Sequence, residues 1–152
     1  MRYLAPRQQQ QGVALNTKQL AHVCVFSHDL AQAELFYVGG LGLTKCFNFL
    51  KNGAWVGLYL SCGARTFIEV FLHDEAPIAK SGQVNHLCLE VEDLAACVAE
   101  LRAKAIDVTE PKYGCDDTWQ AWLKDPSGSL VELFQYTEKS AQFVGGDREI
   151  DW

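Results

Sequence analysis

The sequence predicts an α+β fold made of two tandem βαβββ modules, and an internal repeat is the main reason. The segment Ala21-His22-Val23-Cys24-Val25 recurs 64 positions later as Asn85-His86-Leu87-Cys88-Leu89. The segment Phe67-Ile68-Glu69-Val70-Phe71 recurs 63 positions later as Leu130-Val131-Glu132-Leu133-Phe134. Each copy therefore opens with a histidine and closes with a glutamate, which predicts one domain over residues 18–138 with modules at about 18–73 and 85–138.

Each module is expected to begin with a short apolar strand followed by a helix. The strands are expected at His22–Phe26 and His86–Val91. Asp29 and Asp93 then fit helix N-caps, because an aspartate oxygen accepts the free N–H groups of a first helical turn. Apolar residues at helical spacing follow both aspartates. In the first module the helix is expected to end near Gly39-Gly40, where glycine tolerates the left-handed conformation of a C-cap.

Three more strands are expected in each module. They lie at Thr44–Phe49, Ala54–Ser61 and Arg65–Leu72 in the first module, and at Ile106–Thr109, Thr118–Lys124 and Ser129–Tyr136 in the second. The last two strands are joined by Asp125-Pro126-Ser127-Gly128, in which proline and glycine supply the backbone angles of a tight hairpin turn.

Composition limits the function classes. The chain has 152 residues, 49 % of them hydrophobic, which suits one domain of about 100–150 residues. Its net charge of −6 offers no basic surface for a phosphate backbone or an anionic membrane, so no nucleic-acid or membrane partner is expected. No apolar run approaches the roughly 18–20 residues that span a bilayer, and no signal peptide is apparent. We therefore expect a cytoplasmic protein.

The two ends lack periodicity. Residues 1–17, with a run of four glutamines, are expected to be an N-terminal arm, and residues 139–152 a C-terminal tail; both are candidates for contacts with a second copy.

The cysteines show no C-x-x-C spacing and are expected to be reduced and buried; they are Cys24, Cys46, Cys62, Cys88, Cys97 and Cys115.

Four residues at matching positions of the repeat point to a metal site. His22, Glu69, His86 and Glu132 occupy equivalent places, and copies of a duplicated module face each other about a pseudo-twofold axis, so we expect these side chains to converge, either within one chain or across a dimer. Each glutamate lies in an apolar strand, where an uncompensated carboxylate is costly to bury. Two imidazoles and two carboxylates form a neutral set with one divalent ion, which predicts one such ion, either Ni, Co, Zn, Mn or Fe.

The chain resembles the vicinal oxygen chelate superfamily, which includes glyoxalase I, fosfomycin resistance proteins and extradiol dioxygenases. The resemblance covers about residues 20–138 and rests on both histidine strands, on Phe36-Tyr37-Val38-Gly39-Gly40-Leu41-Gly42-Leu43, and on Asp125-Pro126-Ser127-Gly128-Ser129-Leu130-Val131-Glu132. It implies paired modules that form a cupped mixed sheet around one metal ion, and a homodimer.

The resemblance also implies a reaction. The set His22, Glu69, His86 and Glu132 is similar to the ligand set of glyoxalase I, whereas the extradiol dioxygenases use two histidines and one glutamate around iron. It implies a metal-dependent lyase or isomerase that removes a proton next to a carbonyl, with Glu132 the first candidate base and Glu69 the second. An Fe(II) dioxygenase and a non-catalytic ligand-binding or resistance protein are the alternatives.

The substrate is expected to be a small α-hydroxy-carbonyl compound or a thiohemiacetal. Glutathione is in doubt, because Gln32 stands where glyoxalase I has an arginine that holds the glutathione carboxylate. Gln120 and Trp122 fall on one face of a strand by alternation and are candidate substrate contacts. Arg65 is a candidate cation beside them.

Overall fold

The computed structural model describes residues 19–73 and 84–147. The first module contains β1 (His22–Ser27), the helix α1 (Leu30–Glu34), which continues as the π-helical turn η1 (Leu35–Gly40), and the strands β2 (Thr44–Lys51), β3 (Ala54–Ser61) and β4 (Phe67–Leu72). The second contains β5 (His86–Glu90), α2 (Leu94–Ala103), β6 (Lys112–Tyr113), β7 (Trp119–Lys124) and β8 (Leu130–Gln135), and is followed by the helix α3 (Ala141–Val144). The arm expected at residues 1–17 lies outside the described residues.

The two modules share one topology. Each forms a four-stranded sheet, in the order β1-β4-β3-β2 in the first module and β5-β8-β7-β6 in the second. The first and last strands of each module pair in parallel, and the other pairs are antiparallel. The register is also repeated, because Cys24 pairs with Glu69 and Cys88 pairs with Glu132. The predicted α+β fold with two βαβββ modules is therefore confirmed.

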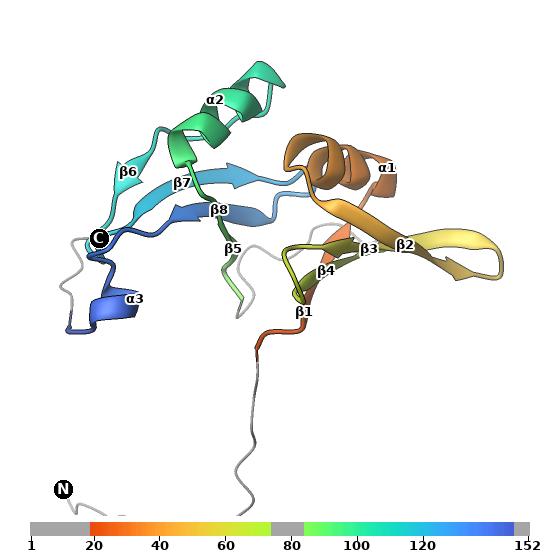
Figure 1. Ribbon diagram of the computed structural model, residues 1–152. Coiled ribbons are helices and arrows are strands. Elements are labelled where there is room, and N and C mark those ends of the chain that lie inside the picture. Colours follow the sequence, from red (N-terminus) through yellow and green to blue (C-terminus); the bar gives the residue numbers. More distant parts are fainter. Residues whose placement is uncertain (1–18, 74–83, 148–152) are drawn as a thin grey trace, which may run out of the picture.

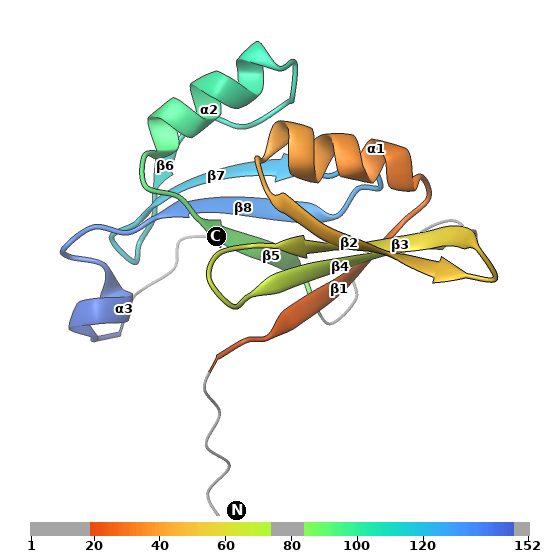
Figure 2. The same ribbon diagram turned by 45° about the vertical axis from the view of Figure 1, so that its right-hand side comes forward.

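Both long helices cover the same side of the sheets, which together form a cup that is open on the other side (Figures 1 and 2). Alternation along the strands sends one set of apolar side chains toward α1 and α2. This core includes Leu58, Leu60, Val70, Val131 and Leu133, each at most 2 % exposed. The residues between them, among them both glutamates of the repeat, face the helix-free side.

The expected helix N-caps are confirmed. The Asp29 carboxylate accepts hydrogen bonds from the backbone N–H groups of Ala31 and Gln32, and that of Asp93 accepts one from Ala96. Within the described residues, no helix has the length and apolar character needed to cross a membrane.

The first helix ends at Gly40 for a different reason from the one expected. Gly42, not Gly40, has the left-handed backbone, with φ of 73°. At Gly40 space is the constraint, because a Cβ atom there would lie 2.6 Å from Cδ1 of Ile106 in the second module. Gly40 therefore allows the two modules to pack closely.

Polar contacts also join the modules. The buried Tyr37 hydroxyl donates a hydrogen bond of 2.9 Å to Asp125, which begins the hairpin turn of the second module. The same carboxylate accepts from the backbone N–H groups of Ser127 and Ser129, so the predicted turn is confirmed. Lys104 adds a bond of 3.1 Å to the carbonyl oxygen of Gly40.

Two expectations about local structure are wrong. The strand expected at Ile106–Thr109 is a single bridge between Val108 and Leu123, and the regular pairing begins only at β6. Pro111 lies in between and has no N–H group to donate to a sheet ladder. The cysteines are free, as expected, but none is buried. Cys24 and Cys88 are open to solvent because they point toward the helix-free side of their sheets.

The first part of the expected tail is folded onto the second module. Ser140 is fully buried, and the N–H of Ala141 donates to the carbonyl of Asp116 at 2.9 Å. The Phe143 ring contacts Tyr136, with centroids 4.8 Å apart. Residues 148–152, the end of the expected tail, lie outside the described residues.

Candidate functional site

The first module brings His22 and Glu69 together on the helix-free face. β1 and β4 are neighbours in the sheet, and the register places both side chains on the same face. Nε2 of His22 lies 3.6 Å from Oε2 of Glu69. The pair is partly open, with 46 % of the histidine side chain and 19 % of the glutamate side chain exposed. An imidazole nitrogen and a carboxylate oxygen thus stand side by side at the surface of the cup.

The second module repeats this arrangement with less solvent access. Nε2 of His86 lies 3.2 Å from Oε2 of Glu132, whose side chain is only 7 % exposed. Nδ1 of His86 lies 3.0 Å from the side-chain oxygen of Asn85, a contact that fixes the ring orientation. The Trp122 indole packs edge-on against the imidazole at 4.9 Å. This pair is therefore held more firmly than the pair in the first module.

Burial changes the protonation behaviour around Glu132. Loss of solvent raises the pKa of this carboxyl, although the neighbouring Cys88 thiol and His86 partly oppose the shift. Desolvation and the adjacent Glu132 charge together raise the pKa of Cys88 to about 12, even though the residue keeps some contact with solvent. Cys88 therefore remains a neutral thiol that donates toward Glu132. Burial and the charge of Glu69 likewise raise the pKa of Cys24.

Aromatic side chains surround the first pair. We call this set, which lies on the face of Glu69 in β2, β3 and β4, the aromatic floor; it consists of Phe47, Phe49, Tyr59, Phe67 and Phe71. Tyr59 is directly opposite Glu69 in the register. Alternation in the sequence places the aromatic residues of β2 on one face and those of β4 on one face, but only the strand register shows that these rings share the face of Glu69.

The corresponding face of the second module is more polar. Gln120 and Trp122 lie on the same face as Glu132, as alternation predicted, and Trp122 is directly opposite it. The side-chain nitrogen of Gln120 lies 3.2 Å from the Thr118 hydroxyl and 3.4 Å from the Asp116 carboxylate. Gln120 is thus part of a polar network beside the second pair.

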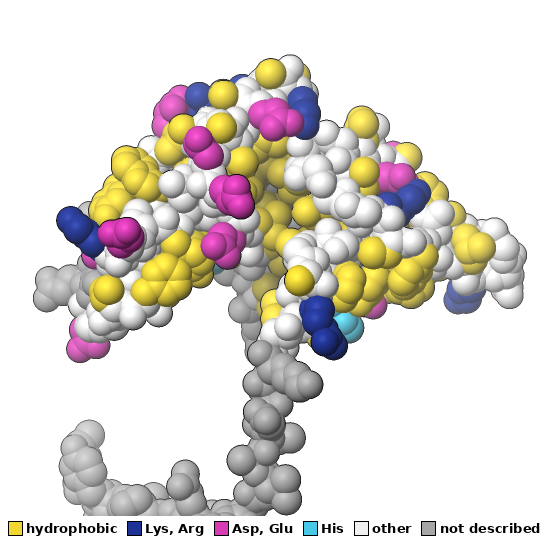
Figure 3. Space-filling model, in the orientation of Figure 1, with side chains coloured by type: hydrophobic (Ala, Val, Ile, Leu, Met, Phe, Trp, Pro, Cys, Tyr) yellow, Lys and Arg dark blue, Asp and Glu magenta, His cyan; other side chains and the backbone are white. Residues whose placement is uncertain are grey.

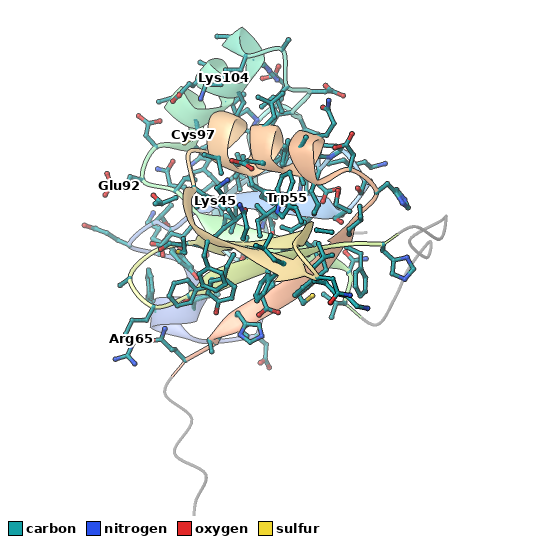
Figure 4. All side chains as sticks on the ribbon, turned by 90° about the vertical axis from the view of Figure 1, so that its right-hand side faces the viewer. Lys45, Trp55, Arg65, Glu92, Cys97 and Lys104 are labelled. Atoms are coloured by element: carbon teal, nitrogen blue, oxygen red, sulfur yellow. The ribbon has the colours of Figure 1, made fainter. Side chains whose placement is uncertain are left out.

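Arg65 is placed differently from the other candidates. It lies in the connection between β3 and β4 and is exposed. Figure 4 shows its side chain pointing away from the sheets into solvent. Its role as a substrate contact stays a prediction, without support from this arrangement.

The donor chemistry of the two pairs suits a divalent ion, since each offers one imidazole nitrogen and one carboxylate oxygen. The structure assembles these donors pairwise. Within residues 19–73 and 84–147, no three His, Cys, Asp or Glu side chains lie close enough together to hold a metal. The two pairs belong to separate sheets. The four-residue site therefore stays a prediction.

A cavity of about 530 Å³ lies between the modules. Its wall combines the end of η1, the connection from β3 to β4, and one face of α2, including Gly40, Cys62, Cys97 and Lys104. Figure 3 shows the corresponding hollow between the two halves, where hydrophobic side chains are visible and acidic ones lie along its edge. Cys88 of β5 and Leu133 of β8 also line it.

Comparison with known proteins identifies the family to which the repeated fold belongs. Residues 21–135 match the model of the "Glyoxalase/Bleomycin resistance protein/Dioxygenase superfamily", which spans both modules. The chain belongs to this superfamily. The resemblance noted from the sequence to the vicinal oxygen chelate proteins is thereby confirmed, and members of this superfamily typically bind a divalent metal ion.

Individual relatives of this superfamily protein differ in activity. The chain is 32 % identical over 144 residues to the mitochondrial methylmalonyl-CoA epimerase of Homo sapiens, covering 86 % of this chain and 81 % of that one. It is 25 % identical to TnmS3, an antibiotic binding protein from Streptomyces sp. CB03234, with a TM-score of 0.63 over 81 % of this chain and 99 % of that one. A lactoylglutathione lyase from Agrobacterium tumefaciens shares the fold at 23 % identity, with a TM-score of 0.61 over 82 % of this chain and 96 % of that one.

Proposed function

We propose that the protein is a metal-dependent isomerase or lyase that removes and returns a proton at a carbon next to a carbonyl group. The observation that carries this proposal is the repeated His–Glu pair on the open face of both sheets. The similarity to methylmalonyl-CoA epimerase supports the isomerase form of the reaction. The proposed substrates are small α-hydroxy-carbonyl compounds, thiohemiacetals or acyl thioesters.

In this proposal His22, Glu69, His86 and Glu132 would hold one divalent ion, with the two pairs contributed by one chain or by two chains of a dimer. The ion would supply Lewis-acid stabilisation of the negative charge on the substrate oxygen. Glu132 is the proposed base that takes the proton from the substrate carbon. Its carboxylate is shielded from water, and the contact with His86 keeps one oxygen in a fixed direction. Glu69, which is more exposed, is the second candidate and is suited to return the proton to the other face of the carbon.

The experiment that tests the proposal is deuterium exchange into substrate. Protein that has been stripped of metal and reloaded with Co²⁺, Ni²⁺ or Zn²⁺ is incubated in D₂O with hydroxyacetone or methylmalonyl-CoA, and exchange is followed by ¹H NMR. We expect exchange at the carbon next to the carbonyl. Glu132→Gln should slow it by at least about a hundredfold, because a general base contributes roughly 10²–10⁴ in rate.

Glu92→Gln is the matched control. Glu92 is exposed, and Figure 4 shows its side chain pointing away from the sheets, so this variant should exchange at the wild-type rate. The metal content of each sample is measured by elemental mass spectrometry. A reloaded wild-type protein that exchanges none of these substrates, or one that retains no metal, would contradict the proposed reaction.

A non-catalytic ligand-binding protein is the second candidate. The similarity to an antibiotic binding protein and the exposed aromatic rings favour it. In that case Glu132→Gln would bind the ligand as tightly as the wild type, and neither protein would exchange deuterium.

A further inference from the structure

We propose that the aromatic floor binds a flat apolar group of the substrate, so that the preferred substrates carry an aryl ring or a similarly planar group beside the carbonyl. The position of the reacting carbon in this inference rests on the proposed function. Binding of the ring depends only on the floor itself, which makes the two separable by experiment.

The rings of the floor form stacks across the strands. Phe47 and Tyr59 lie 4.8 Å apart with 12° between their planes, and Tyr59 and Phe67 lie 5.0 Å apart at 26°. The stack thus runs from β2 over β3 to β4. Its outer member, Phe47, is 48 % exposed. Offset stacking is a favourable arrangement of aromatic rings, and an exposed end of such a stack can accept another ring.

Gly57 shapes the second stack. It lies opposite both Phe49 and Phe71 in the register, and these rings are 4.6 Å apart at 29°. A Cβ atom at Gly57 would approach within 2.8 Å of the Phe71 ring. The missing side chain therefore lets the two rings meet over the strand. The equivalent position in the repeat carries Gln120, so the second module has no such stack.

The floor borders directly on polar groups. Tyr59 lies opposite Glu69 in the strand register, and its ring contacts the His22 ring edge-on, with centroids 6.3 Å apart. A ligand placed here meets an apolar surface on one side and an imidazole and a carboxylate on the other. This combination suits a molecule with oxygen atoms next to a planar hydrocarbon group.

A small molecule is also a better candidate than a docked protein for the ligand of the aromatic floor. A protein docked on the floor would bury the partly exposed Glu69 carboxylate, whose contact with the His22 imidazole is long at 3.6 Å, and burial of a weakly paired carboxylate is costly. A small molecule can leave this carboxylate in contact with water or place a polar atom beside it.

The test compares two ligands that differ only in this group. Isothermal titration calorimetry on the full chain measures 2-hydroxyacetophenone, which carries a phenyl ring, and hydroxyacetone, which carries a methyl group. We expect the phenyl compound to bind about tenfold more tightly, as one added aromatic contact predicts. Phe47→Ala should remove most of this difference and leave hydroxyacetone binding unchanged.

Phe143→Ala is the control, because Phe143 is also an exposed phenylalanine (65 %) but lies outside the floor. Urea unfolding of each variant confirms that the fold is intact. Equal affinity for the two ligands, or a Phe47→Ala protein that retains the phenyl preference, would overturn the inference. Phenyl-selective binding without deuterium exchange would support the floor and contradict the proposed reaction, so the two failures are distinguishable.

Discussion

At the scale of single residues, Tyr37 shows how one hydroxyl can join two modules. The ring is fully buried, and its only polar atom donates to Asp125, itself only 5 % exposed. Burial and the neighbouring carboxylate raise the pKa of Tyr37 far above its ordinary value, so the hydroxyl keeps its proton and remains a donor. The same carboxylate also holds the hairpin turn.

Removing this hydroxyl should therefore destabilise the protein without changing its shape. Tyr37→Phe leaves a buried carboxylate oxygen without a donor, which costs about 1–3 kcal/mol of unfolding free energy. Urea unfolding followed by fluorescence measures it. Tyr113→Phe is the control, because the Tyr113 hydroxyl is exposed and its contact with Asp117 is long, at 3.4 Å. Equal urea midpoints for Tyr37→Phe and Tyr113→Phe would show that the Tyr37 hydrogen bond does not stabilise the fold by this amount.

At the scale of elements, the short helix α3 depends on Asp116 in the connection between β6 and β7. The Asp116 carboxylate accepts hydrogen bonds from Gln142 at 2.8 Å and from Thr118 at 2.7 Å. Burial alone would raise the pKa of Asp116, but these hydrogen bonds hold it below its ordinary value of 3.8. A carboxyl whose pKa is lowered by folding stabilises the folded state when ionised.

The stabilisation of the folded state by the ionised Asp116 carboxylate should decrease as the pH falls. It is fully present above the unfolded pKa and is lost as the pH falls through the lower pKa of the folded state. The difference in unfolding free energy between the wild type and Asp116→Asn should therefore be constant from pH 7 to 5 and shrink below about pH 4. Chemical unfolding at a series of pH values measures the difference; one that grows on acidification contradicts the assignment.

The sequence predicted most elements because their signals are local. The caps at Asp29 and Asp93 and the turn at Asp125 depend on a few neighbouring residues, and all three are confirmed. The prediction of a strand at Ile106–Thr109 is wrong because it considered apolar alternation alone. It took no account of Pro111, which interrupts the ladder and leaves a single bridge. The repeat predicted His22, Glu69, His86 and Glu132 as one set of four ligands, whereas their pairing within each module and the aromatic floor both follow from the strand register.

At the scale of the whole molecule, the way the modules dock could not be predicted. It depends on contacts between residues far apart in the chain, such as Gly40 with Ile106 and Lys104 with Gly40. No periodicity marks such contacts. Convergence of all four proposed metal ligands depends on this docking or on a second chain, neither of which the repeat specifies; the described residues of one chain bring them together in pairs.

Two adjacent glycines test the docking. Ala in place of Gly39 meets only Leu35 at an ordinary distance of 3.4 Å, so Gly39→Ala should be neutral or stabilise by up to about 1 kcal/mol through helix propensity. Gly40→Ala has the same propensity gain but requires the terminal methyl of Ile106 to move, so it should be less stable than Gly39→Ala by up to about 1 kcal/mol. Thermal unfolding compares them; a Gly40→Ala protein as stable as Gly39→Ala would show that the modules yield easily.

The parallel pairing of β1 with β4, and of β5 with β8, also affects the order of events during synthesis. Because the first strand of each module bonds only to the last within the described sheets, neither sheet is complete until its final strand has left the ribosome. Closing such a long loop is a slow step in folding. The strands that carry His22 and His86 are therefore unpaired in the nascent chain until the strand that carries the matching glutamate has been synthesised.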